Sequence, residues 1–474
     1  MPSILSANTL SSGFDVANSL RFNDGSSDYL NLSLGTPSNR KIFTCSAWVK
    51  RASTGTYPIF WFGADANNWF MVKYESDSLR IESKASDSTI IDVRTNALYR
   101  DFSAWYHVLV AVDTSQGTAS NRIKIYVNGV QETSLQTSTY PNQDTDLNVI
   151  TTAEIGNQHT TQYFDGYMAE VVFVDGTAQV NTDLGEFDED SGIWKPINVS
   201  GLTFGTNGFY LEFKQSGTSQ NSSGLGADTS GNDNHYAVNN LTAIDQSTDT
   251  CTNNMPTINQ LTLHSNNIVV SEGNLKATDG GAPWQTTNCT FGLTTGKWYF
   301  ELKATESSSS QYLVLGIQSD NLLSSLANGF GFTNNYSYGM KCYNGEFVFN
   351  ESDGGTSRSY GSAVTDGQIV GVALDLVNLK IYFSINGTYQ NSGNPTSGST
   401  GTGSAGDLQS GQTYFPALAV ADNGAHPVGE FNFGSPPYSE SGGNSDADGY
   451  GNFAAAPPSG YYSINTKNLA EYGG

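Results

Sequence analysis

The segment 105–113 reads Trp-Tyr-His-Val-Leu-Val-Ala-Val-Asp, and the segment 122–129 reads Arg-Ile-Lys-Ile-Tyr-Val-Asn-Gly. Apolar residues alternate with other residues in both segments, which is the period-two pattern of a strand with one face in a core. Asn-Gly supplies the positive φ that a tight two-residue turn needs. The two segments therefore predict a strand, a polar loop and a second strand that ends in a hairpin turn.

The same arrangement recurs in the second half of the chain. Residues 368–387 read Gln-Ile-Val-Gly-Val-Ala-Leu-Asp-Leu-Val-Asn-Leu-Lys-Ile-Tyr-Phe-Ser-Ile-Asn-Gly. The first strand again ends on an aspartate, Asp375, and the second again ends at Asn-Gly. Because each copy predicts a half-buried sheet, the repeat predicts two antiparallel β-sandwiches in tandem.

Strand-like runs bounded by turn residues recur on both sides of this repeat, and long amphipathic helical patterns are absent. This combination is typical of the all-β class. The expected organisation is an N-terminal arm at 1–18, a first sandwich at 19–214, an Asn/Ser/Thr-rich connection at 215–259, a second sandwich at 260–438 and an extended tail at 439–474.

The net charge of the chain limits the classes of partner that it can bind. Among 474 residues, 45 Asp and Glu stand against 21 Lys and Arg, for a net charge of -24. Such a surface repels phosphate backbones, so we expect no nucleic-acid partner. The N-terminal residues lack the pattern of a signal peptide, and no apolar run reaches about 18 residues. We therefore expect a chain that is made in a cytoplasm and is not inserted in a membrane.

Few residues suggest reactive chemistry. The four cysteines are far apart, without the spacing of a zinc site or a disulfide framework, and are expected to be buried as small apolar residues: Cys45, Cys251, Cys289 and Cys342. The five histidines are scattered, and His107 is expected to be a structural histidine of a strand. No glycine loop of the phosphate-binding type is present.

Several motifs of the first half occur in the order found in a known family. They are Ala-Asn-Ser-Leu-Arg-Phe-Asn (17–23), Cys-Ser-Ala-Trp-Val-Lys-Arg (45–51), Trp-Tyr-His-Val (105–108) and Tyr-Phe-Asp-Gly-Tyr-Met-Ala-Glu-Val (163–171). With them the first domain resembles the laminin-G-like, concanavalin-A-type jelly rolls of phage virion proteins. Residues 228–236 continue the family pattern, so the resemblance extends the domain into the connection as an alternative to a plain linker.

The second half is similar to SPRY (B30.2-type) sandwiches. The motifs are Gly-Lys-Trp-Tyr-Phe-Glu-Leu (296–302), Val-Leu-Gly-Ile (314–317), Gly-Val-Ala-Leu-Asp-Leu (371–376), Ile-Asn-Gly (385–387), Phe-Pro-Ala-Leu (415–418) and Phe-Asn-Phe-Gly (431–434). The pairing of the two domains, with the tail motif Pro-Pro-Ser-Gly-Tyr-Tyr (457–462), resembles virion proteins of tailed phages.

This resemblance implies a non-enzymatic virion protein, displayed on the particle exterior as part of a tail fibre or appendage, that binds host-surface glycans or receptors. Its expected partners are other virion proteins and further copies of itself, with a homotrimer favoured. The alternatives are a capsid or tail decoration or cement protein without a receptor role, and a polysaccharide depolymerase.

The best candidate for acid–base chemistry is Glu-Phe-Asp-Glu-Asp at 186–190. On a strand, alternate carboxylates would share one face, as in some glycosidases with this jelly-roll fold. The flanking Gly185 and Ser191-Gly192 favour a loop instead. We therefore expect a solvated acidic turn and assign no catalytic residue.

Two binding sites are predicted. Pyranose rings stack on exposed aromatic side chains, so the aromatics near turns are candidate ligand-binding residues. These are Tyr57, Trp61, Trp69, Trp284, Tyr336 and Tyr338. Because Ca²⁺ prefers oxygen ligands in irregular loops, Asp228, Asn232 and Asn234 are candidate calcium ligands. The alternative for this loop is Asx-turn hydrogen bonding without a metal.

Overall fold

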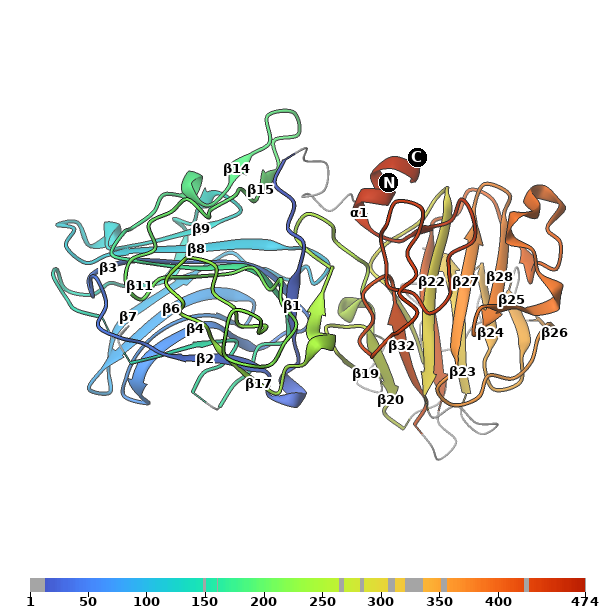
Figure 1. Ribbon diagram of the computed structural model, residues 1–474, viewed down its shortest axis with the longest axis horizontal. Coiled ribbons are helices and arrows are strands. Elements are labelled where there is room, and N and C mark those ends of the chain that lie inside the picture. Colours follow the sequence, from blue (N-terminus) through green and yellow to red (C-terminus); the bar gives the residue numbers. More distant parts are fainter. Residues whose placement is uncertain are drawn as a thin grey trace. The chain divides into compact units, whose positions relative to one another are not determined.

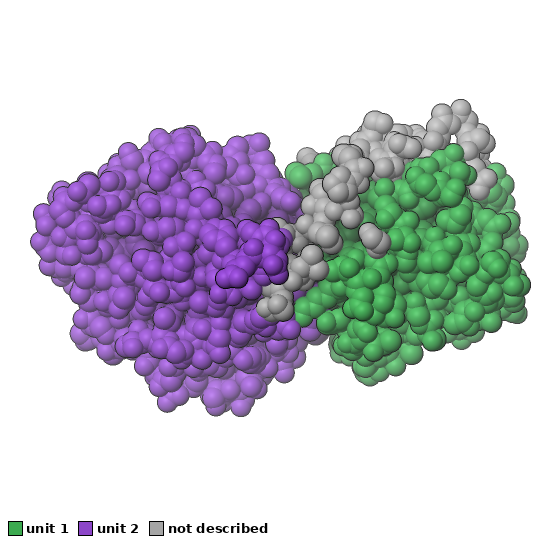
Figure 2. Space-filling view, turned by 90° about the horizontal axis from the view of Figure 1, so that it is seen from above, with its two compact units in different colours: residues 1–6, 255–474 green, residues 7–254 purple. Residues whose placement is uncertain are grey.

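The computed structural model describes residues 13–147, 151–159, 161–263, 268–281, 285–305, 312–319, 336–350, 356–421 and 426–473. These residues form two compact units that divide after Asn254: the first unit in sequence is purple in Figure 2, and the second unit is green. Each unit is built almost entirely from antiparallel strands in two large sheets (Figure 1). The predicted all-β class with tandem sandwiches is therefore confirmed.

The first unit contains two eight-stranded sheets, here called sheet A and sheet B. Sheet A follows the order β10 (Val130–Gln131), β9 (Ile123–Val127), β8 (Tyr106–Asp113), β3 (Ile42–Arg51), β13 (Gly166–Asp175), β1 (Ser19–Phe22) and β18 (Gln246–Ser247), and β16 (Phe209–Leu211) pairs with β13. Sheet B follows the order β11 (Leu135–Thr139), β7 (Ser88–Thr95), β6 (Ser78–Ala85), β5 (Asn68–Glu75), β4 (Thr56–Asp65), β12 (Thr152–Ile155), β2 (Tyr29–Ser33) and β17 (Ala237–Asn239).

The alternation that predicted the first hairpin places its apolar residues in the core between these sheets. Val108 pairs with Val127 across β8 and β9, and Val110 pairs with Ile125. All four are buried in the same core cluster. A second hairpin, β14 (Glu186–Phe187) and β15 (Trp194–Lys195), lies on the outer side of sheet A near β8 and β9 (Figure 1).

The connection at 215–259 differs from a linker between domains. Strands β17 and β18 in this segment join sheet B and sheet A, and Leu225 and Tyr236 are buried in the core of the first unit. These apolar side chains, widely spaced among polar residues, hold the segment in place. The division between the two units therefore falls after Asn254.

The second unit also contains two sheets, here called sheet C and sheet D. Sheet C follows the order β19 (Ile268–Ser271), β20 (Lys276–Asp279), β32 (Val428–Asn432), β22 (Lys297–Thr305), β27 (Ile369–Asp375), β28 (Lys380–Ile385) and β29 (Thr388–Tyr389), with β30 (Gly406–Asp407) on β28 and β33 (Tyr462–Ser463) on β22. Sheet D follows the order β21 (Gln285–Asn288), β31 (Tyr414–Ala421), β23 (Tyr312–Ser319), β24 (Ser337–Lys341), β25 (Glu346–Asn350) and β26 (Thr356–Ser359).

The C-terminal residues, expected to form an extended tail, pack on the outer face of sheet C. Phe453 and Tyr461 join a buried cluster with Tyr299 of β22. The buried Glu301 carboxylate accepts the backbone N–H groups of Ala454 and Ala455 at 2.9 and 3.0 Å. Two aromatic anchors and one buried acceptor therefore fix a segment whose composition is that of a loop.

Helical structure is short and peripheral. The α-helix α1 spans Thr466–Tyr472 near the C-terminus. The 3-10 turns are η1 (Asp24–Ser26), η2 (Ala119–Asn121), η3 (Asn181–Asp183), η4 (Ala243–Asp245), η5 (Gln260–Thr262), η7 (Gln390–Ser392) and η8 (Pro395–Thr400). Within the described ranges, no helix has the length and apolarity needed to cross a membrane. All four cysteines are buried free thiols, as expected.

Candidate functional site

The outward side chains of sheet A and of sheet B form two different surfaces. The covered face is the outer face of sheet A, with Ser46, Trp48 and Lys50 of β3, His107 and Leu109 of β8, and Glu170 and Val172 of β13.

The open face is the outer face of sheet B. Its outward residues Trp61 of β4, Met71 and Lys73 of β5 and Glu154 of β12 are buried among their neighbours. Its other outward residues are partly exposed: Arg80 and Glu82 of β6, Asp92 and Arg94 of β7 and Asn31 of β2.

Residues 178–204, here called the covering segment, close the covered face. Leu184, Val199 and Phe204 pack on the outward apolar residues of β8 and β13. Trp194 packs with Trp48 in a second cluster. The covering segment therefore turns the outer face of sheet A into a buried layer.

His107 lies in this layer between the rings of Trp48 and Trp194. Its ring stacks on Trp48 and on Trp194, with centroids 5.0 and 5.9 Å away. Nδ1 accepts the indole N–H of Trp194 at 3.0 Å, so the proton of the neutral ring is on Nε2, which lies 2.8 Å from Ser46 Oγ. Burial lowers the pKa of His107 to about 3. The ring is neutral with both nitrogens paired, which confirms a structural histidine.

The same geometry bears on nucleophilic chemistry at Ser46. A general base must offer a free lone pair to the hydroxyl proton. His107 presents an N–H to Ser46 because Trp194, and not a carboxylate, faces Nδ1. In this tautomer the pair cannot act as a serine–histidine relay.

Glu170 is a buried carboxyl group on the same face. It lies in a β-bulge of β13, with a positive φ of 50°, and is 7% exposed. Its Oε2 accepts the hydroxyl proton of Tyr210. Burial raises the pKa of Glu170 to about 7, although the hydrogen bond from Tyr210 opposes that rise.

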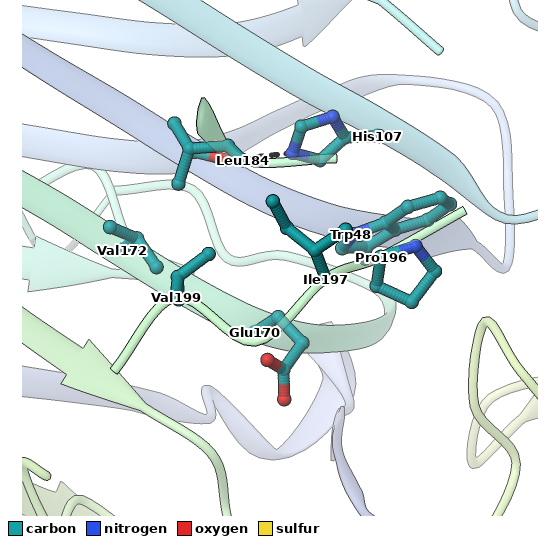
Figure 3. A pocket seen from close by; sticks show the side chains of 9 residues that line it. Trp48, His107, Glu170, Val172, Leu184, Pro196, Ile197 and Val199 are labelled. Atoms are coloured by element: carbon teal, nitrogen blue, oxygen red, sulfur yellow. Dashed lines mark hydrogen bonds between the residues drawn. The ribbon is translucent and has the colours of Figure 1, made fainter. Parts of the chain in front are cut away.

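A small cavity lies between Glu170, the His107 pair and the covering segment. Its volume is about 10 Å³, which is on the order of one water molecule. Pro196, Ile197 and Val199 of the covering segment form its outer wall (Figure 3). A cavity of this size can hold a water but not a sugar or a cofactor.

The open face carries a network of paired charges. Lys73 Nζ lies 2.8 Å from Glu75 and 3.1 Å from Glu82. Arg80 contacts the same two glutamates and also Asp92, at 2.9 Å. Cross-strand pairing of outward residues brings these charges together, because β5, β6 and β7 are neighbours in sheet B.

An aromatic cluster adjoins this network. Trp61 of β4 and Trp69 and Met71 of β5 pack together. The exposed His159 stacks on Trp61, with centroids 4.9 Å apart and planes at 20°. Glu154, which pairs with Trp61 across the sheet, accepts the backbone N–H of His159 at 2.8 Å.

Polar side chains continue the open face beyond Glu154. Asn31 is the next cross-strand neighbour, and its Oδ1 accepts from Asn239 Nδ2 at 2.8 Å. Both asparagines are half-buried. The open face therefore combines aromatic rings, carboxylates and amides in fixed positions.

The aromatic residues predicted to bind a ligand are mostly buried. Trp61 is 1% exposed, Trp69 is 7% exposed and donates its indole N–H to Ala66, and Tyr57 is 8% exposed with its hydroxyl on Ser53. Strand register explains why these residues are buried although they lie near turns in the sequence. They belong to strands whose faces are covered by neighbouring side chains. Of these three, Trp61 and Trp69 share the open face, whereas Tyr57 belongs to the core.

The described candidates of the second unit, Tyr338 and Tyr336, are buried or half-buried. Tyr338 is 1% exposed, and its hydroxyl oxygen accepts the backbone N–H of Gln409 at 3.1 Å. Tyr336 is half-buried against the core of that unit. Trp284 lies outside the described residues.

The predicted calcium ligands have hydrogen-bond partners within the protein. Both oxygens of Asp228 accept hydrogen bonds from its own loop and from Tyr210, at 2.8–2.9 Å. Asn232 and Asn234 point their NH₂ groups at the carbonyl oxygen of Gly208. The arrangement corresponds to the Asx-turn alternative, in which the oxygens serve the backbone. Across the described ranges, no group of three or more His, Cys, Asp or Glu side chains is placed to hold a metal.

The acidic run at 186–190 forms the hairpin β14–β15 and its turn. Lys195 Nζ lies 3.3 Å from Glu186 and 3.1 Å from Asp188, so one cation is shared by both carboxylates. Hydrogen bonds from Ser191 lower the pKa of Asp188 to about 2, and a bond from Lys195 adds to this effect. Asp188 stays ionised, so it cannot serve as a proton donor at neutral pH.

Comparisons with known families locate both domains. Residues 24–180 match a family model described as the concanavalin A-like lectin/glucanases superfamily, Laminin_G_3, and residues 297–435 match the SPRY domain. The chain therefore contains a concanavalin-A-like N-terminal domain and a C-terminal SPRY domain. A search of curated proteins finds no match.

Solved structures with these folds share little sequence with the chain. The SPRY domain of human HERC1 is 12% identical and covers 37% of this chain and 96% of that chain, with a TM-score of 0.29. A heptameric SAP-like pentraxin from Limulus polyphemus is 17% identical over 36% of this chain and 81% of that chain, with a TM-score of 0.28. Domains LG4-5 of the mouse laminin alpha1 chain are 13% identical over 88% and 89%, with a TM-score of 0.28.

Two residues of the site were missed in the sequence. Glu170 stands alone in the apolar run Gly-Tyr-Met-Ala-Glu-Val-Val-Phe-Val at 166–174, and a single carboxyl in such a run is a signal for a buried acid. His159 follows a strand in a polar loop, where nothing in the sequence indicates a stack on Trp61.

Proposed function

We propose that the chain is a non-enzymatic virion protein of a tailed phage, a tail fibre or appendage component that binds host-surface glycans or receptors through the open face. The observation that carries this proposal is the contrast between the two outer faces of the first unit. The covering segment closes sheet A. On sheet B, the outward side chains of Arg80, Asp92 and Asn31 stay partly exposed, and His159 beside them is exposed. The motifs of both domains and their pairing support the virion assignment.

The chemistry of the open face suits a saccharide. Sugar recognition combines an aromatic surface for the pyranose ring with carboxylate and amide groups for the hydroxyls. The exposed His159 ring, held on the buried Trp61, supplies the ring surface, and the half-buried Asn31 and Asn239 supply polar groups. Because these polar groups are already held by hydrogen bonds, ordering them on binding costs little entropy.

A binding measurement tests this proposal. Purified full-length chain is applied to host cells and to a glycan array, together with His159→Ala and Asn239→Ala. We expect each substitution to weaken binding about tenfold or more, equivalent to about 1.4 kcal/mol. Lys124→Ala on β9 of sheet A is the matched control and leaves binding unchanged. Equal binding by all three variants would show that the open face is not the binding surface.

The location of the protein tests the virion assignment. A cryo-EM map of the intact particle should place copies at the distal end of a tail appendage, with the open face toward solvent. Three copies around one axis would agree with the favoured homotrimer. Absence of the chain from the particle would overturn the assignment.

A second candidate, a capsid or tail decoration protein, is favoured by a different surface. Val130, Val180 and Phe187 are large apolar side chains that are 59, 51 and 47% exposed. They lie around Trp194, since Phe187 contacts its ring at 4.8 Å and Asn181 donates to the carbonyl of Gly129. Exposed apolar groups of this kind mark contacts between subunits. A map with these residues wedged between shell proteins would support decoration over adhesion.

A further inference from the structure

Three side chains meet in the buried layer beside the covered face. Lys50 Nζ lies 2.7 Å from the amide oxygen Oδ1 of Asn254 and 2.8 Å from the carboxylate oxygen Oδ2 of Asp249. Lys50, Asn254 and Asp249 are 1, 2 and 3% exposed. A lysine amine therefore faces an amide and a carboxylate in a site that excludes bulk water.

We propose that Lys50 and Asn254 become joined by an intramolecular isopeptide bond, formed without any other protein, with Asp249 as the proton-transfer group. The carbon that the amine must attack, Asn254 Cγ, is one bond beyond the oxygen that Lys50 already contacts. The reaction needs no oxidant, metal or cofactor, because an amine and an amide exchange one nitrogen for another.

The site favours the nucleophilic form of the lysine. A charged ammonium has no lone pair, so an amine attacks only after losing a proton. Burial lowers the pKa of Lys50, and the charge of Asp249 and its hydrogen bond only partly oppose this effect. The Tyr167 ring lies 5.6 Å from Nζ and adds to the aromatic walls of the site.

The atoms of the reaction balance within the three groups. Asp249 takes one proton from the Lys50 ammonium, and the neutral amine attacks Asn254 Cγ. A second proton passes from Nζ through Asp249 to Asn254 Nδ2. The bond between Cγ and Nδ2 then breaks, and one ammonia leaves while Asp249 stays protonated. The bond between Nζ and Cγ is the new amide.

Asn254, and not Asp249, is the electrophile for two reasons. The Asp249 carboxylate carries a charge that resists attack, and its Oδ1 accepts the indole N–H of Trp105 at 3.2 Å, which holds it beside the amine. Asn254 Nδ2 donates to the carbonyl oxygen of Ser103 at 2.7 Å. This bond, with the contact between Lys50 and Oδ1, fixes the orientation of the amide group.

The bond would close the first unit on itself. Lys50 lies on β3 in the middle of sheet A, and Asn254 is the last residue of the unit, 204 positions later in the sequence. A covalent link over so long a loop restricts the unfolded chain strongly, as a disulfide does. The four cysteines are free thiols. The isopeptide bond would therefore be a covalent cross-link in a unit without disulfides.

Mass spectrometry of the purified full-length chain tests the proposal. We expect an intact mass lower than the sequence mass by one ammonia. A tryptic digest should contain a branched peptide that joins residues 42–51, uncleaved after Lys50, to residues 215–276. An unmodified mass with a free peptide 42–50 would overturn the proposal. A mass lower by one water would place the bond at Asp249 instead and would also overturn it.

Variants separate the bond from the hydrogen-bond network. Asn254→Ala keeps the Lys50–Asp249 ion pair and removes only the amide, so it should fold and retain the full mass. Asp249→Asn should abolish or greatly slow the ammonia loss. Ammonia loss and a branched peptide that persist in Asn254→Ala would contradict the assignment.

The chain also offers a matched internal control. Lys73 is 6% exposed and lies between Glu75 and Glu82, at 2.8 and 3.1 Å, so it has the carboxylates without the amide. The same digest should show normal cleavage after Lys73. A branch at Lys73 would mean that burial beside a carboxylate is enough, and that Asn254 has no special role.

Discussion

The two outer faces of the first unit come from strands with the same alternation, yet they have opposite environments. On β3 the outward residues Ser46 and Trp48 are buried below the covering segment, and Lys50 is buried against Asp249 and Asn254. On β6 the outward residues Arg80 and Glu82 stay partly exposed and pair with charges of neighbouring strands. The strand pattern sets which way a side chain points. Whether solvent reaches that face of the sheet depends on a segment distant in the sequence.

This difference predicts where the stability of the unit resides. Polar groups of the covered face each depend on one or two specific partners, as His107 depends on Trp194 and Ser46. Loss of a partner leaves a buried polar group unpaired, which is costly. Charges of the open face share several partners in a wetter environment, where the loss of one pair costs little.

The largest expected effect is at Trp194. Trp194→Ala should lower the free energy of unfolding by about 3–5 kcal/mol, because it empties a buried ring site and leaves Nδ1 of His107 without its donor. Chemical denaturation followed by circular dichroism measures the change. Phe187→Ala, in the same hairpin but 47% exposed, is the control and should cost far less. Equal losses for both variants would show that the specific contact between Trp194 and His107 adds nothing to the stability of the unit.

Glu170 should produce the next effect, which depends on pH. Burial raises the pKa of Glu170 from 4.5 to about 7 in the folded protein. The folded state therefore binds the proton more tightly, and the stability from this group is complete below the unfolded pKa and is lost as the pH rises to 7. Glu170→Gln should remove that loss and stabilise the unit at pH 8 by up to about 3 kcal/mol.

The pH dependence should have the opposite sign on the open face. Burial raises the pKa of Asp92, but the hydrogen bond and charge of Arg80 outweigh it and lower the pKa overall. Stability from Asp92 is present above its unfolded pKa and is lost as the pH falls through the folded one. In unfolding curves measured from about pH 2 to 8, Glu170→Gln should gain stability over the original protein as the pH approaches 8, whereas Asp92→Asn should be less stable at neutral pH and approach the original protein below about pH 4. Parallel curves would refute the distinction between the faces.

Arg80 should have a smaller effect that salt removes. Arg80→Ala breaks contacts with Glu75, Glu82 and Asp92. The expected loss is about 1 kcal/mol at low ionic strength and less at about 1 M salt, because partly exposed charges are screened. Unfolding at both salt concentrations measures it. A loss that is independent of salt would point to packing of the arginine stem instead of charge.

The sequence predicted much of the fold and little of the site, for a physical reason. Alternation and Asn-Gly turns are local properties, so the hairpin β8–β9 and its repeat β27–β28 could be predicted from a few residues. The stack of His159 on Trp61 depends on where a loop returns after more than ninety residues. The pairing of Lys50 with Asn254 depends on the whole first unit closing on itself.

The same reason explains why several candidate residues lie in other surroundings than their sequence positions suggest. Trp69 and Tyr57 lie near turns, where exposure is expected, but both are buried, because exposure depends on cross-strand neighbours that the local sequence does not reveal. Asp228 has the residue type of a calcium ligand, yet its oxygens serve backbone N–H groups of its own loop and of Tyr210. Residue type gives the chemical capacity of a side chain, and its partners decide how that capacity is used.

Asn239 should show the smallest effect on stability and the clearest effect on binding. Its side chain is half-buried and donates one hydrogen bond, to Asn31, so Asn239→Ala should change the free energy of unfolding by no more than about 0.5 kcal/mol. If the open face binds a glycan, this variant loses binding while its unfolding curve overlays that of the original protein. Because stability is unchanged, the lost affinity would belong to the surface itself. A variant that binds normally would leave the open face as a stable surface without a ligand, and would shift the comparison toward the exposed apolar residues beside Trp194.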